Sequence, residues 1–350
     1  MRDVAVVSFA QSRHVRREPD RNEVEILMPV VREARERSGL GRGEIDFVCS
    51  GSTDYLAGQS FAFVAGLDAV GAWPPICESH VEMDGAWALY EAWVKIQTGY
   101  ADSALVYGFG KASMGDLPEV LALQLDPYVL TPLWPDAVSL AALQARLCLE
   151  GGVVSEGAMA EAAVRDRRNA KDNPFAQVKG DFEAAKLLGE PFHVAPLRKH
   201  DCAPISDGAA AVVIAAGDVA RRVCKRPAWI TGFTHIAEPQ DLGVRDLTRS
   251  RSTEIAAEKA GVGKGPVDVA ELSAPFTHQE LLVERALGLG GATKVNPSGG
   301  ALAANPIMAV GLVRVGEAAR RVQDGSARRA VAHATSGPCL QQNLVCVLEG

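Results

Sequence analysis

Short apolar runs alternate along the chain with longer stretches in which apolar residues recur at helical spacing. The apolar runs are typical of buried strands and lie at residues 4–9, 45–49, 104–108 and 208–214. Amphipathic or small-residue stretches between them predict helices. Strands that alternate with helices in this way predict an α/β protein with largely buried mixed sheets.

Residues 81–99 predict the helix around which the rest of the chain is organised. Its start is acidic, with Glu82 and Asp84, and Gly85 follows at a point where the backbone must be approached closely. Small residues such as Ala88 allow another element to pack tightly against this helix, as a central buried position requires. The side chain at the start of this helix therefore determines which reactions the protein can catalyse.

An internal repeat relates the two halves of the chain. In each half a helix, capped by Asn22 in the first copy and by Ser252 in the second, ends in a glycine-rich turn before a strand. The matched turn positions, at one fixed offset, are Gly39 with Gly261, Gly41 with Gly263, Gly43 with Gly265 and Asp46 with Asp268. Two generic helix–turn–strand units would not keep three glycines at the same spacing, so the pattern predicts a duplicated fold.

The second half also supplies a counterpart of the central helix. Small residues at 295–306 lead into an Ala- and Gly-rich helix through residues 310–322. Apolar strands at 330–333 and 343–348 follow it. We therefore expect two helix starts to face each other at a shared site.

An insertion between Gly110 and about His200 breaks this symmetry, because the second half has no counterpart of it. Amphipathic patterns at 155–169 and 181–188 predict helices within it. An insertion of this length that leaves a sheet usually forms a lid, a substrate-binding cover or a contact surface. A cap that only stabilises the fold is an equally open interpretation.

Composition limits the classes of function. A chain of 350 residues with 47% hydrophobic and 23% charged residues is an ordinary soluble protein that can hold two domains. Its net charge of −7 argues against nucleic acid or an anionic membrane as a partner. No apolar run approaches the ~20 residues of a membrane helix, and residues 1–9 lack the features of a signal peptide. We expect a cytoplasmic protein without a membrane-inserted segment.

The seven cysteines have no paired spacing, and no histidine–cysteine cluster predicts a zinc site. An odd number of scattered thiols fits a reducing compartment better than a disulfide framework. We therefore expect neither a metal site nor disulfides.

The duplicated α/β pattern, the glycine-rich helix starts and the insertion together resemble the thiolase superfamily. Within it, the chain looks most like the sterol-carrier-protein-type thiolases, often called lipid-transfer proteins. The resemblance covers essentially the whole chain. It is most specific at residues 85–88, 206–210 and 296–301.

The resemblance implies a five-layer αβαβα fold, with halves at 1–224 and 225–350 and a loop domain at about 112–197 over the bound acyl-CoA. CoA would enter as part of the substrate, and no separate cofactor is expected. Relatives form dimers or tetramers, so a homodimer or a hetero-oligomer is expected here. The residues expected to contact substrate or CoA are Gly85, Ser273, Phe276, Gly299, Gly300 and Gly337.

The chain departs from this family where the family places its nucleophile. Counted back from Gly85, the family's Cys-x-Ser-Gly pattern puts Glu82 in place of the cysteine and Asp84 in place of the serine. A helix start favours a thiolate by lowering the pKa of a cysteine. A carboxylate there can be a helix cap or a general base, and both interpretations stay open.

Two further family motifs are changed. Residues 304–306 match the family's Gly-His-Pro, so Asn305 replaces a histidine of the oxyanion hole with an amide that can still donate. Residues 273–276 stand where relatives have Asn-Glu-Ala-Phe or His-Asp-Cys-Phe. Only Phe276 of that motif remains, and His278 follows it as a candidate base.

The loop from His333 to Cys339 stands where the family has its last catalytic loop. Cys339 is the thiol, and His333 the imidazole, that we expect near the site. A small buried residue in a tight turn is the alternative interpretation of Cys339.

Three functions are compatible with the resemblance. The first is retro-aldol cleavage of a β-hydroxyacyl-CoA in lipid or steroid side-chain degradation, which needs a base and a stabilised enolate but no cysteine nucleophile. Glu82, Asp84, His278 or His333 would then be the base. The second is a non-catalytic subunit that pairs with an active paralogue. The third, thiolytic cleavage by an acetyl-CoA acyltransferase, lacks its nucleophile.

The aldolase interpretation carries an expectation about partners. Steroid side-chain aldolases that resemble this family work with a small OB-fold, zinc-ribbon protein. They use tyrosines at the positions that correspond to Ser273 and Asn305, and this chain has none there. The resemblance therefore predicts an acyl-CoA enzyme of this kind, with its base moved to another residue.

Overall fold

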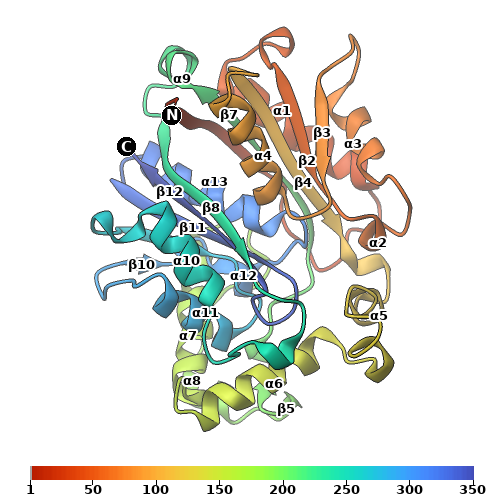
Figure 1. Ribbon diagram of the computed structural model, residues 1–350, viewed down its shortest axis with the longest axis vertical. Helices are drawn as coiled ribbons and strands as arrows, with labels where there is room; N and C mark the ends of the chain where they lie inside the picture. The colour runs from red at the N-terminus through yellow and green to blue at the C-terminus, as the bar shows by residue number, and fades with distance from the viewer. Residues whose placement is uncertain (1) are drawn as a thin grey trace.

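The computed structural model describes residues 2–350. Within them, ten strands form one mixed sheet (Figure 1). The strands of the first half are β1 (Val4–Gln11), β2 (Phe47–Gly51), β3 (Glu78–Val81), β4 (Ser103–Lys111) and β7 (Asp207–Ala216). Those of the second half are β8 (Ala228–Ala237), β9 (Val269–Leu272), β10 (Lys294–Val295), β11 (Arg329–Ser336) and β12 (Gln342–Glu349).

The two sets of strands are arranged in the same way. The first half has the order β1-β7-β4-β2-β3 and the second half has β8-β12-β11-β9-β10. In both, the first two neighbouring pairs are antiparallel and the last two are parallel. The duplication predicted from the glycine-rich turns is therefore confirmed in the topology of the sheet.

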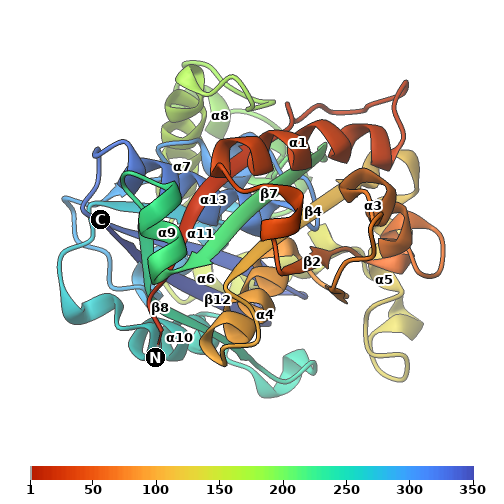
Figure 2. The same cartoon turned by 90° about the horizontal axis from the view of Figure 1, so that it is seen from above.

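A short ladder between β1 and β8 joins the halves. Only Ala5 with Trp229 and Val6 with Ala228 are paired there. On either side of this seam the strands continue as two layers, and helices fill the space between them (Figure 2).

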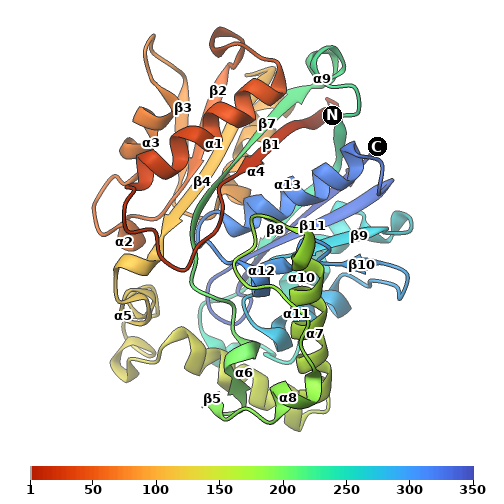
Figure 3. The same cartoon turned by 180° about the vertical axis from the view of Figure 1, so that it is seen from behind.

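The helices that cover the sheet fall into three layers. Between the halves lie α4 (Gly85–Gln97) and α13 (Val310–Gln323). Outside the first half lie α1 (Glu23–Ser38), α3 (Phe63–Val70) and α9 (Gly217–Val223), and outside the second half lie α10 (Arg251–Ala260) and α11 (Thr277–Ala286) (Figure 3). With the two layers of strands, these give the expected αβαβα arrangement.

Alternation along β1 explains how one strand serves two layers. Val4 and Val6 are buried in the cluster that contains α4 and α13. Ala5 and Val7 are buried in the cluster that contains α1. Successive side chains of a strand point to opposite faces, so a strand covered on both faces must be apolar throughout.

The helix ends follow the sequence signals in most places. Helix α1 begins at Asn22, whose side chain accepts from the backbone N–H of Glu25 at 2.9 Å while the Glu25 carboxylate accepts from the N–H of Asn22. This capping box stabilises the helix by ~1 kcal/mol. The helix ends at Gly39, which has a φ of 70°, as predicted.

Two predicted helix starts are placed differently. Helix α10 is preceded by Ser250, and Ser252 lies inside its first turn, where its hydroxyl donates to Glu238 Oε1 at 2.6 Å. The central helix begins at Gly85 rather than at residue 81, because Val81 ends β3 and Asp84 is the residue that caps the helix.

The insertion between β4 and β7 lies at one end of the molecule (Figure 1). It contains α5 (Leu117–Ala122), α6 (Ala137–Glu150), α7 (Glu156–Asn169), α8 (Ala184–Leu188) and a two-stranded sheet of β5 (Phe192–Val194) and β6 (Leu197–Arg198). Short helices α2 (Asp54–Ala57) and α12 (Gly300–Ala303) lie elsewhere in the two halves.

A buried polar cluster holds this insertion on the second half. Arg165 of α7 pairs with Glu280 and Glu284 of α11. The amide nitrogen of Asn296 donates to Asp166 Oδ2 and Glu280 Oε2, both at 2.8 Å. Burial, and then the adjacent Asp166, raise the pKa of Glu280 well above its usual range. Asn296 and Arg165, each in contact with both carboxyl groups, thus join a segment of the first half to the second.

None of the helices within residues 2–350 combines the length and the apolar composition that crossing a membrane would require.

Candidate active site

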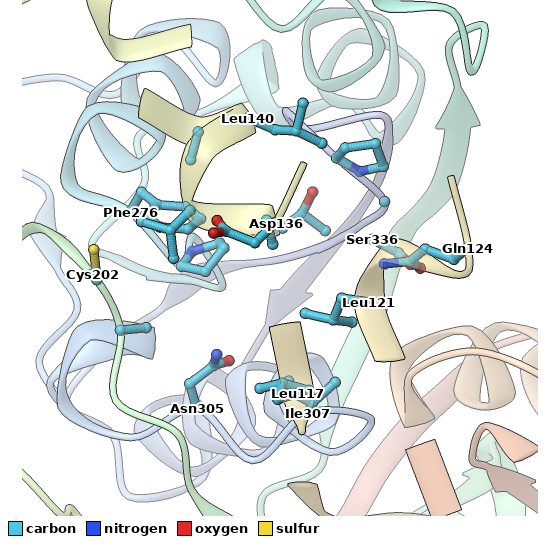
Figure 4. A pocket seen from close by; sticks show the side chains of 18 of the residues that line it. Leu117, Leu121, Gln124, Asp136, Leu140, Cys202, Phe276, Asn305, Ile307 and Ser336 are labelled. Carbon is cyan, nitrogen blue, oxygen red and sulfur yellow. The ribbon is translucent and has the colours of Figure 1, made fainter. Parts of the chain in front are cut away.

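A cavity of about 270 Å³ lies between the insertion and the two central helices. Its wall is mainly apolar, and Figure 4 shows side chains of the insertion facing those of the second half across it. The apolar lining includes Leu117 and Leu121 of α5, Val138 and Leu140 of α6, Phe276 before α11, and Ile307, Met308 and Val310 near the start of α13. The insertion therefore forms part of the cavity wall.

Six residues that the sequence singled out meet at this cavity. They come from the start of α4, the loop before α11, the segment before α13 and the loop between β11 and β12. These residues are Asp84, Ser273, Phe276, Asn305, Gly337 and Cys339. Positions spread over about 250 residues of sequence, from 84 to 339, are thus brought to one place.

Asp84 lies at the bottom of the cavity, where the two central helices begin. Its Oδ1 accepts from the backbone N–H groups of Ala86 at 2.8 Å and Leu312 at 3.0 Å. Its Oδ2 accepts from the N–H of Gly311 at 3.0 Å. Burial raises the pKa of Asp84, and the three backbone donors oppose that rise. The carboxylate is therefore a shared cap for α4 and α13, and three backbone donors already use most of its acceptor capacity.

Asn305 is held by its backbone and leaves its side chain free. Its N–H donates to Ser206 Oγ at 3.0 Å, and that hydroxyl donates to Gln177 Oε1 at 2.8 Å. Within residues 2–350 its side-chain amide makes no hydrogen bond, and it points into the cavity (Figure 4). A half-buried amide N–H in an apolar cavity can stabilise an oxygen on which negative charge develops.

Glu82 is not part of this cavity. It is exposed, and its Oε1 accepts from the backbone N–H of Asp54 at 2.6 Å. The chain bends between Val81 and Asp84, and this bend turns Glu82 toward the surface while Asp84 stays buried. The residue that replaces the family's cysteine in sequence therefore does not stand where a nucleophile would meet a substrate in the cavity.

Two of the candidate histidines are also outside the cavity. His278 is buried with its Nε2 3.3 Å from Gln144 Oε1, and burial lowers its pKa to about 3. His333 is buried with its Nε2 2.9 Å from Asn343 Oδ1, and burial lowers its pKa to about 4. Both imidazoles are therefore neutral groups of the core.

The remaining predicted contacts are glycines that allow close packing. A Cβ on Gly85 would lie 2.9 Å from Leu312 Cδ2, so this glycine lets α4 and α13 meet. Gly299 has a φ of 103°, and a Cβ there would lie 2.6 Å from that of Ala170. Gly300 lies beside Asn296 in the same way. None of these three glycines is part of the cavity wall in the described structure.

No protein-family model matches the chain. Among curated proteins, it is 29% identical to the benzoylsuccinyl-CoA thiolase subunit BbsB of Thauera aromatica over 57% of this chain and 59% of that one. That match spans less than two thirds of the relative. The chain is also 26% identical to an acetyl-CoA acetyltransferase of Methanothermobacter thermautotrophicus, over 96% of this chain and 95% of that one.

Solved structures agree over the full length. A structure named as an Ltp2-ChsH2(DUF35) aldolase aligns with a TM-score of 0.83 at 19% identity, over 99% of this chain and 98% of that one. Human mitochondrial 3-ketoacyl-CoA thiolase aligns with a TM-score of 0.77 at 18% identity, over 100% and 99%. Over its full length the chain has the thiolase fold, and its curated relatives include thiolase-type enzymes. Sterol carrier protein 2 of Gallus gallus, 25% identical over 95% of this chain and 69% of that one, is a further relative.

Because cysteines carry covalent catalysis in many enzymes, the state of the two cysteines in the cavity limits its chemistry. Burial raises the pKa of Cys339 to about 12, and its Sγ donates to the backbone oxygen of Leu140 at 3.5 Å. Burial raises the pKa of Cys202, which also lines the cavity, to about 12. Both groups are thiols at neutral pH, whereas covalent catalysis by cysteine needs a thiolate.

The loop that carries Cys339 is nevertheless shaped for close contact with the cavity. Cys339 and the adjacent Leu340 have φ angles of 54° and 60°, and Met308 on the opposite side of the site has a φ of 75°. Arg245 donates to the backbone oxygens of Pro338 and Cys339, and so fixes this loop. Non-glycine residues in this region of φ and ψ are concentrated at functional sites in many proteins.

Sequence reasoning missed one acidic residue of this thiolase-type cavity. Asp136 is the N-cap of α6, and its Oδ1 accepts from the backbone N–H of Ser139 at 2.7 Å. Figure 4 shows its carboxylate directed into the cavity between Phe276 and Ser336. The pattern of Pro135, Asp136 and a following apolar stretch is an N-cap signal. That signal marks the start of a helix but does not say what the cap faces.

Proposed function

We propose that this chain binds an acyl-CoA and cleaves the Cα–Cβ bond of a β-hydroxyacyl-CoA by a retro-aldol reaction, in lipid or steroid side-chain degradation. The observation that carries the proposal is the free amide of Asn305 in an apolar cavity whose cysteines, Cys202 and Cys339, are protonated. A site of this kind can stabilise an enolate but has no group to form an acyl-enzyme.

The reaction needs a general base and a hydrogen-bond donor from the protein. The base removes the proton of the β-hydroxyl, and the electrons of the O–H bond form the new carbonyl. The Cα–Cβ bond then breaks, and its electron pair moves onto the thioester as an enolate. Protonation at Cα gives the shortened acyl-CoA, while the other fragment leaves as a ketone or an aldehyde. The Asn305 amide would donate to the thioester oxygen as that oxygen gains charge.

The size and lining of the cavity support an acyl group as its occupant. A volume of about 270 Å³ lies just below the roughly 300–1,000 Å³ of typical small-molecule sites. The acyl part would fill this space, and the rest of CoA would extend beyond it. Leu117, Leu121 and Leu140 would pack on the hydrocarbon of the substrate, each buried CH₂ contributing ~0.8 kcal/mol.

A partner protein is part of this proposal. The name of the Ltp2-ChsH2(DUF35) aldolase joins two proteins, and BbsB is named as a subunit. These names support a chain that works in an assembly, as a homodimer or with an OB-fold, zinc-ribbon protein or a thiolase-like paralogue.

The test is to incubate the purified chain, alone and with the candidate partner, with a series of β-hydroxyacyl-CoA substrates. We expect a shortened acyl-CoA and a ketone or aldehyde in equal amounts, measured by mass spectrometry, without consumption of free CoA. Absence of both products in every combination would contradict the aldolase proposal. Acylation of the protein by a 3-ketoacyl-CoA, seen as a mass increase, would support thiolytic cleavage instead.

One observation favours a second candidate, a non-catalytic subunit that keeps the fold to pair with an active paralogue. Asp84 is committed to capping two helices, and Glu82 is outside the cavity. The helix start that relatives use for chemistry would then have become purely structural. Binding of an acyl-CoA by this chain without turnover, together with activation of a co-purified thiolase-like protein, would support this alternative.

A further inference from the structure

We propose that the general base of this cleavage is Asp136, which comes from the insertion and not from any position that the thiolase motifs mark. This inference rests on the proposed function, because it names the residue that removes the β-hydroxyl proton. It differs from every base that the sequence pointed to, namely Glu82, Asp84, His278 and His333.

Five groups in the wall of the cavity can ionise. In the described chain these are Tyr55, Asp84, Asp136, Cys202 and Cys339. Lysine, arginine and histidine side chains are absent from that wall within residues 2–350. A base for the β-hydroxyl must therefore come from these five groups or from outside the described chain.

Four of the five groups are unsuited to take a proton at neutral pH. Burial raises the pKa of Tyr55, and it raises the pKa of Cys202 and of Cys339 to about 12, so all three carry their proton already. The carboxylate of Asp84 accepts three backbone hydrogen bonds and holds two helices. Taking a proton there would break those bonds.

Asp136 differs from Asp84 because, in the described chain, only one of its two carboxylate oxygens accepts a hydrogen bond. One carboxylate oxygen accepts from the Ser139 N–H at 2.7 Å, which fixes the orientation of the group. The other oxygen makes no hydrogen bond or ion pair within residues 2–350, and the side chain is half-buried at the cavity wall. An oriented carboxylate with one free oxygen is suited to general-base catalysis.

The place of Asp136 relative to Asn305 fits the two roles. Figure 4 shows both side chains directed into the same cavity, Asp136 from the insertion and Asn305 from the segment before α13. A substrate between them would present its β-hydroxyl to the carboxylate and its thioester oxygen to the amide. Asp136 would take the hydroxyl proton as the Cα–Cβ bond breaks, and the same proton can return to Cα of the enolate. The carboxylate is then regenerated, and no co-reactant is consumed.

The decisive variant is Asp136→Asn in the full chain, assayed with its partner if one is needed. Asparagine is as good an N-cap as aspartate, so the cap of α6 is kept and only the base is lost. We expect kcat to fall by ~10²–10⁴-fold with little change in KM or in the melting temperature. The rise of activity with pH on the acid side of the wild-type profile should also disappear, which a purely structural role would not cause.

Asp116→Asn is the matched control. Asp116 caps α5 in the same insertion, with its Oδ1 3.4 Å from the N–H of Glu119, but it is not part of the cavity wall. This variant should keep the wild-type rate and pH profile. Asp136→Glu, which restores a carboxylate, should recover part of the activity that Asp136→Asn loses.

The outcomes separate this inference from the proposed function. Cleavage by the wild type and by Asp136→Asn at the same rate would overturn Asp136 as the base and leave the aldolase function intact. A parallel loss of melting temperature and activity in Asp136→Asn, with the acid side of the profile unchanged, would overturn it in favour of a structural role. No cleavage by the wild type with any β-hydroxyacyl-CoA would overturn both.

Discussion

Helices α4 and α13 occupy equivalent places in the two halves, but their first turns are held differently. The side chain of Asp84, the residue before α4, caps that helix. Helix α13 follows Ala309, which has no capping side chain, and the N–H groups of Gly311 and Leu312 donate to Asp84 across the molecule. One carboxylate of the first half therefore completes a helix of each half.

This difference bears on whether either helix start can activate a nucleophile. A helix start activates a nucleophile through its free N–H groups and the positive end of its dipole. Here the carboxylate of Asp84 uses those donors and offsets that charge. The strand order is the same in the two halves, whereas the two helix starts share one capping carboxylate.

Asp84→Ala is expected to have the largest effect, because it removes the shared cap of α4 and α13. This substitution leaves buried N–H groups of Ala86, Gly311 and Leu312 without an acceptor, and each unsatisfied donor costs about 1–3 kcal/mol. We expect a loss on the order of 3–5 kcal/mol in the free energy of unfolding, measured in urea. Asp116→Ala, which removes the cap of one short helix, should cost only ~1 kcal/mol. Equal effects of the two variants would contradict the shared-cap interpretation.

The second test concerns the cavity wall. Asn305→Ala removes the free amide, so kcat for β-hydroxyacyl-CoA cleavage should fall by ~10²–10³-fold, as for other oxyanion donors. Stability should change little, because only the backbone of Asn305 is bonded to the rest of the described chain. Asn305→His, which restores a donor, should recover part of the rate. An unchanged kcat in Asn305→Ala would mean that the amide does not touch the reacting thioester.

Acid unfolding provides a third test, because two buried neutral histidines lie in the second half. Burial lowers the pKa of His278 to about 3 and that of His333 to about 4, below the ordinary value of 6.5. The unfolded chain therefore binds more protons below pH 6.5, so stability is full above that pH and is lost as the pH falls toward 4. The loss per histidine is on the order of 3 kcal/mol. The unfolding free energy of His278→Gln should depend less on pH in this window, as measured in urea at a series of pH values.

The smallest effect is expected for Glu82→Gln. Glu82 is exposed, and a glutamine oxygen can still accept from the N–H of Asp54. The rate should not change, and the free energy of unfolding should stay within about 0.5 kcal/mol. Loss of activity in this variant would show that Glu82 reaches the substrate, and would restore it as a candidate base.

The fold could be predicted from the sequence because the patterns that specify its elements are local and occur in both halves. The cap at Asn22, the left-handed glycines at 39 and 261, and the apolar strands each follow from a few neighbouring residues. Their recurrence at a fixed offset then fixed the duplication. The misplaced cap at Ser252 shows the limit: a serine two residues into a helix looks like a cap until its hydroxyl is seen to donate to Glu238.

The site could be predicted only in part, because a motif gives the positions of residues in the sequence but not the direction in which their side chains point. Asp84 and Asn305 were found at the cavity, whereas the bend before α4 turns Glu82 away from it. His278 follows Phe276 by two residues, yet the turn of α11 buries it beside Gln144. Asp136 was missed because the insertion has no repeat partner, so nothing in the sequence indicated which of its helix caps faces inward.

The position of β1 in the sheet has a consequence for folding during translation. Residues 4–11 form a strand whose two neighbours are β7, at 207–216, and β8, which begins at 228. At ~5–20 residues per second, translation leaves this apolar strand without either neighbour for roughly 10–45 s. During that time the strand is an exposed apolar segment that can aggregate, so we expect the yield of the protein to rise when chaperones are supplied in excess.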